Sequence, residues 1–361
     1  MKYKLPNLNS LRLIAASLVM IHHTEQLKSL YELPNLWNNQ SIYTIGKLGV
    51  VLFFVLSGFL ITHLLLNEVQ SKGKINIKNF FVRRILRIWP LYYTILILAF
   101  FIFPFITFFE YPEKAFFING YPLKQLLLYI FMLPNLAVSN LDSIAYASQS
   151  WSIGTEEQFY LIWPFLFFFF KNKKLFISIL SIIPLYLIFK YFLESNNINI
   201  LGLNIKNFWQ FFNIDCMAIG GVIAFLNHRN YDKIKFLLNK KIFWTTTILT
   251  TILIVFGVNF GFFHYEVYAC LFIVIIYNLA FNNQLKELLE YKIMDKLGEI
   301  SYGMYMYHVI IISIAIKIMK SYNFYNNTLL YIIIFCITIS VSRISYEFLE
   351  KPFLKLKKKF L

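Results

Sequence analysis

The segment from Arg12 to His23 combines a cation, a long apolar run and two adjacent imidazoles in the letters RLIAASLVMIHH. Eleven residues are close to three turns of an α-helix, so His23 lies on nearly the same face as Arg12, about 16 Å along the axis. If this helix starts at a membrane surface, His23 reaches about halfway through a hydrocarbon core of roughly 30 Å. A titratable ring is costly at that depth, which makes a functional site the default hypothesis. The alternative is a histidine that is satisfied inside a helix bundle.

A second chemically unusual stretch, WSIGTEEQFYLIWP, begins at Trp151 and places Glu156 and Glu157 in the first two turns of an apolar segment. Helical spacing puts Ser152, Glu156 and Tyr160 on one face. A charged side chain in hydrocarbon costs roughly 2.5–3.5 kcal/mol on insertion scales, unless a water-filled cavity or a cationic partner offsets it. An acidic helix N-terminus stabilised by the helix dipole is the alternative, but it does not explain the polar and aromatic neighbours.

Three arginines, Arg83, Arg84 and Arg87, occur together in FVRRILRIWP. Arg83 and Arg87 are four residues apart and therefore share a helical face. Guanidinium groups form paired hydrogen bonds with phosphate oxygens, so the cluster suits a phosphate-bearing ligand. The alternative is a signal for membrane topology or a contact with lipid headgroups.

Small and polar residues interrupt two further apolar segments. Ser57 and Gly58 lie in GVVLFFVLSGFLI, where small side chains let a ligand or a neighbouring helix approach the backbone closely. His308 ends the stretch ISYGMYMYH, about a dozen ångströms into a later apolar segment. Each residue alone is explained by helix packing, but together they indicate a polar interior. The sequence has no phosphate-binding loop, dinucleotide fingerprint, zinc-ligand spacing or GxSxG motif, so we expect no soluble cofactor fold and no metal.

The composition is that of a membrane protein: 58% of the 361 residues are hydrophobic, 14% are charged and the mean hydropathy is +0.61. Soluble domains are nearer half apolar and a quarter charged. We therefore predict an all-α polytopic membrane protein, with about ten transmembrane helices in a single domain over residues 1–361. The predicted spans are 10–28, 42–66, 88–109, 151–170, 174–193, 208–227, 242–260, 262–281, 300–319 and 328–349.

The net charge of +16 comes largely from Lys and Arg in short loops between the predicted spans. This is the positive-inside pattern, so we expect no nucleic-acid partner and place the chain in the cell (cytoplasmic) membrane with both termini cytoplasmic. The apolar stretch 123–138 is short and contains Pro134. If it crossed the membrane, every later basic cluster would change sides. We therefore predict a re-entrant or surface-lying segment on the outer side.

Taken in order, these motifs resemble the signatures of the acyltransferase 3 family of integral membrane acyltransferases. The family pattern of Arg, ten residues and His selects His23 over His22. Two positions depart from the family pattern: Val51 stands near a place where an acid is frequent, and Asn213 replaces the Arg that usually lies two residues before Asp215. Some relatives carry a C-terminal hydrolase-like domain, and we expect the stand-alone form here. The matching stretches are 12–23, 52–61, 81–90, 151–164, 297–308 and 345–356.

The resemblance implies transfer of an acyl group, usually acetyl, from cytoplasmic acyl-CoA (acetyl-CoA) to a hydroxyl of an extracytoplasmic glycan or other cell-surface acceptor. A membrane exporter of a modified polysaccharide or small molecule is the competing class, because polar residues inside a bundle serve transport equally well. The acceptor, a covalent acyl-enzyme and the oligomeric state are left open. The implied roles are catalysis for His23, Glu156 and Arg12, donor binding for Arg83, Arg84, Arg87, Ser57 and Gly58, and substrate binding for Trp151, Ser152, Glu157, Tyr160 and His308.

Overall fold

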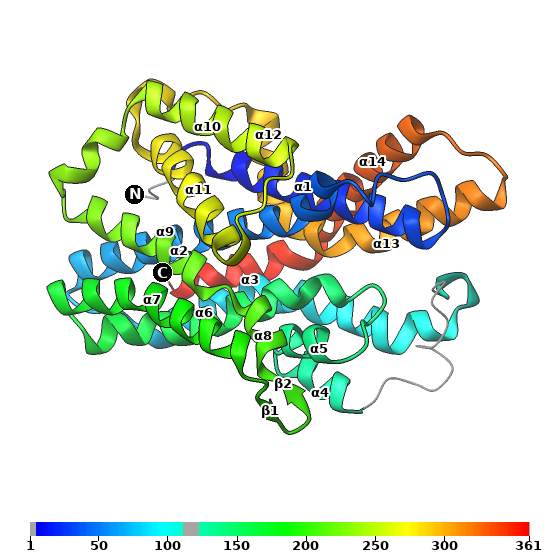
Figure 1. Cartoon of the computed structure of the whole chain (residues 1–361), viewed down its shortest axis with the longest axis horizontal. Coiled ribbons are helices and arrows are strands. Elements are labelled where there is room, and N and C mark those ends of the chain that lie inside the picture. The colour runs from blue at the N-terminus through cyan, green and yellow to red at the C-terminus, as the bar shows by residue number, and fades with distance from the viewer. Residues whose placement is uncertain (1–4, 111–122, 361) are drawn as a thin grey trace.

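The computed structural model describes residues 5–110 and 123–360 of the predicted single domain. Long helices run roughly side by side along the long axis of the molecule, and α1 begins at the same end of the bundle at which α15 ends (Figure 1). The long helices are α1 (Leu8–Leu30), α2 (Gln40–Lys72), α3 (Ile77–Ile97), α6 (Trp151–Phe169), α7 (Asn172–Ser195), α9 (Ile214–His228), α10 (Lys240–Val255), α11 (His264–Phe281), α13 (Ser301–Ser321) and α14 (Asn327–Ser345). The shorter helices are α4 (Leu123–Ile130), α5 (Pro134–Asn140), α8 (Ile205–Phe212), α12 (Lys292–Glu299) and α15 (Lys351–Leu356).

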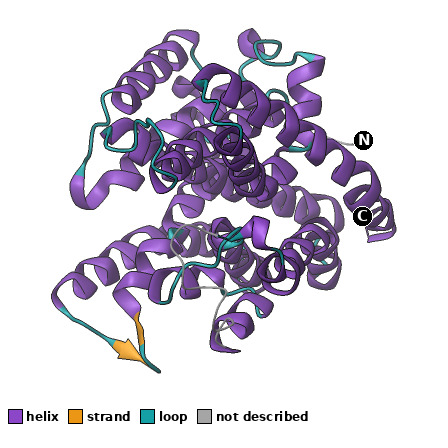
Figure 2. Cartoon of the chain, turned by 90° about the vertical axis from the view of Figure 1, so that its right-hand side faces the viewer, coloured by secondary structure: helices purple, strands orange, loops and turns teal. Residues whose placement is uncertain are grey.

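Single 3₁₀- or π-helical turns extend or connect these helices, and one small hairpin lies at the periphery of the bundle (Figure 2). The hairpin pairs β1 (Asn199–Ile200) with β2 (Leu203–Asn204) in an antiparallel register. The short helical turns are η1 (Leu98–Ile102), η2 (Phe103–Phe105), η3 (Thr107–Phe109), η4 (Ser148–Ser150), η5 (Asp232–Leu237), η6 (Gly261–Phe263), η7 (Asn283–Leu285), η8 (Tyr346–Glu350) and η9 (Lys357–Phe360).

In the part of the chain that the structure describes, seven helical segments are long and apolar enough to cross a membrane. They cover Gln40–Lys72, Ile77–Phe105, Asn172–Ser195, Ile205–His228, Gly261–Phe281, Ser301–Ser321 and Asn327–Leu356. An all-α, multi-pass membrane protein is thereby confirmed, whereas the number of ten crossings is not. The remaining three predicted spans correspond to α1, α6 and α10, which are helical but do not meet the same criterion.

Helix α2 forms the centre of the bundle, because most of its apolar side chains are buried against neighbouring helices. Its closest neighbour is α9, and glycines on both helices make the contact possible. A β-carbon at Gly58 would overlap the backbone of Met217, and one at Gly220 would overlap the backbone of Val55. Only glycine leaves this space, so the two backbones lie in direct contact. Gly58 thus faces α9 and not a ligand cavity.

The third predicted span begins earlier than the sequence suggested. The side chain of Asn76 accepts a hydrogen bond from the backbone nitrogen of Asn79 at 2.9 Å, which caps a helix that starts at Ile77 instead of residue 88. The helix continues through Pro90. The three arginines therefore lie on this helix itself, within its first eleven residues.

The stretch 123–138 forms two short helices, α4 and α5, separated by a turn in which Met132 has a positive φ of 59°. Helix α4 has eight residues, about 12 Å of rise, which is far less than a hydrocarbon core of roughly 30 Å. Neither helix crosses a membrane by itself. A re-entrant or surface-lying position for this stretch stays a prediction.

Candidate active site

A cavity of about 260 Å³ lies between α1, α2, α3, α6 and α13. Among the residues that the structure describes, four cationic side chains line it together with one carboxylate, that of Glu156. This excess of positive charge in a partly enclosed, low-dielectric space favours an anionic ligand. The cationic side chains are Arg12, Arg84, Arg87 and Lys357.

Glu156 is the polar centre of the cavity wall. Its carboxylate accepts hydrogen bonds from the hydroxyl groups of Ser57 on α2 and Tyr160 on α6. The Arg84 guanidinium lies 5.6 Å from the centre of the Tyr160 ring, within the range of a cation–π contact. These contacts join α2, α3 and α6 at one point. Ser152 lines the cavity with Glu156 and Tyr160, as their helical spacing predicts.

The two adjacent glutamates do not share this site. Glu157 lies outside the cavity lining, where the indole nitrogen of Trp89 donates to its Oε2 at 3.5 Å. Its other oxygen is buried and has no hydrogen-bond partner among the residues that the structure describes. Trp151 also lies outside the lining, and its ring packs edge-on against Phe54 and Phe211. The structure therefore brings Glu156 to the cavity and leaves Glu157 and Trp151 in the surrounding helix contacts.

Arg83 points away from the cavity and pairs with Glu68 instead, at 2.9 Å between Nη2 and Oε2. Its Nη1 donates to the backbone carbonyl of Phe360 at 2.8 Å. Arg84 and Arg87, three residues apart, are the two members of the cluster that reach the cavity. Helical spacing allows either Arg84 (three residues away) or Arg83 (four residues away) to share a face with Arg87. Because Arg83 is paired with Glu68, Arg84 is the one that reaches the cavity with Arg87.

Fully buried His308 and half-buried His23 form a pair beside the cavity. Nδ1 of His23 lies 2.8 Å from Nε2 of His308, and Nδ1 of His308 lies 2.6 Å from the carbonyl oxygen of Tyr305. Neither histidine lines the cavity, but Tyr305 does, and its hydroxyl lies 2.7 Å from that of Ser152. Tyr305 thus connects the histidine pair to the cavity wall. The neighbouring His22 forms its hydrogen bond through Nδ1 with the carbonyl of Ile42 at 2.9 Å, away from the His23–His308–Tyr305 series of hydrogen bonds.

The hydrogen bonds assign the protons on both rings. A carbonyl oxygen only accepts, so Nδ1 of His308 carries the proton that points to Tyr305. When His308 is neutral, its Nε2 has a free lone pair and accepts from Nδ1 of His23. Neutral His23 then keeps its own lone pair on Nε2. This is the tautomer that a general base requires, with the second nitrogen fixed by a neighbour.

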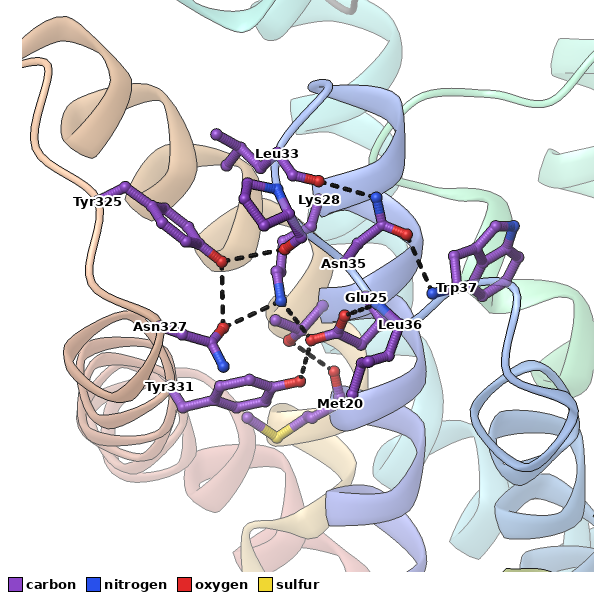
Figure 3. A network of polar contacts seen from close by, with 12 residues as sticks. Met20, Glu25, Lys28, Leu33, Asn35, Leu36, Trp37, Tyr325, Asn327 and Tyr331 are labelled. Atoms are coloured by element: carbon purple, nitrogen blue, oxygen red, sulfur yellow. Dashed lines mark hydrogen bonds and ion pairs between the residues drawn. The ribbon is translucent and has the colours of Figure 1, made fainter. Parts of the chain in front are cut away.

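A separate polar network fixes α1 just beyond His23 (Figure 3). Glu25 accepts from the Lys28 ammonium at 2.6 Å, from the Tyr331 hydroxyl at 2.7 Å and from the Leu36 backbone nitrogen at 2.6 Å. Glu25 and Lys28 are almost completely buried. Because Tyr331 belongs to α14, the network joins α1 to α14 and limits the rotation of the helix that carries His23.

Sequence reasoning missed several polar groups at the cavity, and Tyr305 and Lys357 are two of them. Tyr305 belongs to a motif with three tyrosines, and its spacing of three residues before His308 was the available signal. Lys357 lies in a lysine-rich segment that resembles an ordinary membrane-proximal tail. No cluster of three or more His, Cys, Asp or Glu side chains within residues 5–110 and 123–360 has an arrangement that could hold a metal ion.

The fold and this cavity define a multi-pass membrane protein with an internal cationic site. The chain belongs to the acyltransferase domain family (Acyl_transf_3), whose model matches residues 5–347, and the predicted family is thereby confirmed. The chain is similar to the peptidoglycan O-acetyltransferase OatA of Listeria monocytogenes, with 32% identity over 185 residues, or 48% of this chain and 26% of that protein. It is also similar to the O-acetyltransferase OatA of Staphylococcus aureus, with 27% identity over 377 residues, or 97% of this chain and 57% of that protein.

The curated relatives are longer proteins, and the chain spans at most about 57% of the length of these two. No solved structure matches the chain significantly.

Proposed function

We propose that the protein is a membrane O-acetyltransferase that moves an acetyl group from acetyl-CoA, on the cytoplasmic side, to a hydroxyl of an extracytoplasmic glycan. The main observation in support of this proposal is the cavity in which arginines face Glu156, with the His23–His308 pair beside it. Family membership supports acyl transfer, and the name of the Listeria monocytogenes relative favours a cell-wall glycan, peptidoglycan, as the acceptor.

Two features support acetyl-CoA as the donor: the positive charge of the cavity and the distance from its arginines to the histidine pair. Guanidinium groups bind phosphate oxygens through paired hydrogen bonds, and Arg12, Arg84 and Arg87 supply three of them. The acyl group of acyl-CoA is at the far end of a long flexible arm. Because Arg12 and His23 are about 16 Å apart along α1, a donor with its phosphates at the arginines directs its thioester toward the histidine pair.

His23 is then the general base. Its Nε2 takes the proton of the acceptor hydroxyl while the hydroxyl oxygen attacks the thioester carbonyl. The new C–O bond of the acetyl ester forms, the C–S bond breaks, and the departing thiolate receives the proton from His23. His308 accepts from Nδ1 of His23 throughout, which keeps Nε2 as the proton carrier. Such a base contributes about 10²–10⁴-fold to the rate.

The test compares His23→Ala with His22→Ala in the full-length protein, reconstituted in vesicles with acetyl-CoA and a soluble glycan acceptor. We expect His23→Ala to lose at least about 100-fold in acetyl transfer and to keep acetyl-CoA binding, with little change for His22→Ala. Full activity of His23→Ala would rule out the base. Glycan movement across the membrane without release of CoA would instead identify an exporter.

A further inference from the structure

The end of the described chain folds back onto the cavity. Helix α15 and the turn η9 pack along α3, and Lys357, the first residue of η9, lines the cavity together with Arg84 and Arg87. The other lysines of this segment with described side chains do not line it. Lys355, for example, is exposed and lies outside the lining. The segment therefore contributes one selected cation to the site.

The ion pair of Arg83 holds this segment in place. Arg83 is buried, binds Glu68 on α2 with one nitrogen, and donates to the carbonyl of Phe360 with another. Glu68 also accepts from the backbone nitrogen of Asn76 at 2.9 Å, so it is itself fixed at the junction of α2 and α3. The guanidinium thus joins three chain segments, and the carbonyl that it binds lies three residues after Lys357, at the end of the same turn.

We propose that Lys357 is a further binding residue for the phosphates of the acyl donor, and that Arg83 and Glu68 are positioning residues that hold it in the cavity. This inference rests on the proposed function. A lysine ammonium binds phosphate as a compact point charge, which complements the directional contacts of the arginines. Within the described part of the lining, four cations stand against one carboxylate, that of Glu156, which matches a ligand that carries several phosphate charges. Phosphate of a lipid headgroup shares this chemistry, and the experiment separates the two sources.

The experiment measures acetyl-transfer kinetics and CoA binding for Lys357→Gln, with Lys355→Gln as the matched control, in full-length protein in neutral detergent. A charge-assisted contact is worth more than 1.4 kcal/mol, so KM for acetyl-CoA should rise about tenfold with kcat nearly unchanged. Acetyl-pantetheine, which lacks the phosphates, should show the same KM with wild type and Lys357→Gln. The Lys355→Gln control should behave as wild type with both donors.

The positioning role has its own readout. Arg83→Ala and Glu68→Gln should each raise KM for acetyl-CoA. When either is combined with Lys357→Gln, the free-energy change for donor binding should be smaller than the sum of the two separate changes, because all three residues act on one contact. Arg83→Lys should recover part of the affinity through its charge. Full additivity of the changes would overturn the positioning role.

The outcomes separate the two proposals. If wild-type protein fails to bind CoA, the proposed function fails first. If wild type binds CoA and Lys357→Gln equals Lys355→Gln, the present inference is overturned while the proposed function stands. An equal KM increase for acetyl-pantetheine would also overturn it, because the defect would not involve phosphate. A defect that occurs only in vesicles of anionic lipid would assign Lys357 to a lipid headgroup and remove it from the donor site.

Discussion

Replacing His308 by Leu tests the histidine pair most directly. Leucine removes the acceptor of the 2.8 Å hydrogen bond from His23 and leaves the Nδ1–H of this half-buried ring without that partner. An unsatisfied buried donor costs about 1–3 kcal/mol. If this loss falls on the transition state, where Nδ1 carries more positive charge, kcat decreases by about 5- to 150-fold at 1.36 kcal/mol per factor of ten.

The assay is steady-state acetyl transfer at saturating acetyl-CoA, together with a binding measurement for CoA. KM for the donor should change little, because His308 lies outside the cavity lining. His308→Gln is the matched control, since its amide oxygen can still accept from His23. It should recover much of the lost kcat. Equal kcat for His308→Leu and wild type would refute the reasoning, and so would equal losses in His308→Leu and His308→Gln.

Two further predictions concern the frame of the site. Gly58→Ala should lower the free energy of unfolding by about 3 kcal/mol or more, because the new methyl group would overlap the backbone of Met217. In Gly303→Ala the methyl group meets a side chain at 3.1 Å, so its melting temperature in detergent should fall less; equal losses would contradict the steric argument. Glu25→Gln should destabilise the protein by about 3–5 kcal/mol, because it leaves the Lys28 ammonium buried without its counter-charge. Thermal unfolding that matches wild type would show that this network does not hold α1.

The part of the site that follows from one helix could be predicted. Ser152, Glu156 and Tyr160 repeat every four residues, and helical periodicity alone places them on one wall. The arginine cluster shows where this reasoning ends. Spacing allows Arg84 or Arg83 to accompany Arg87, and the choice depends on the ion pair of Arg83 with Glu68 and on its contact with the carbonyl of Phe360, 277 residues away. No local pattern encodes such a contact.

For the histidine pair and the helices as well, local patterns in the sequence predict only part of the structure. A buried His23 is suggested by its depth in an apolar helix, but its partner is 285 residues distant and is found only through the packing of α1 against α13. The long helices follow from hydropathy, whereas their ends depend on local capping, as Asn76 shows for α3. Asn213 separates α8 from α9 inside a single predicted span, because its backbone leaves the helical region with φ 3° and ψ 43°.

The direct backbone contact of α2 with α9 divides the molecule into a fixed and an adjustable part. Two helices that touch without intervening side chains cannot slide past each other without a clash, so the wall that carries Ser57 keeps its position. If the ligand is the proposed acyl-CoA, we expect any widening of the cavity that admits it to come from the opposite wall, where a hydrogen bond from Arg83 ties α3 to the carbonyl of Phe360 near the end of the chain. In that case the hydrogen bond between Arg83 and Phe360 would belong to the part of the protein that adjusts to the ligand.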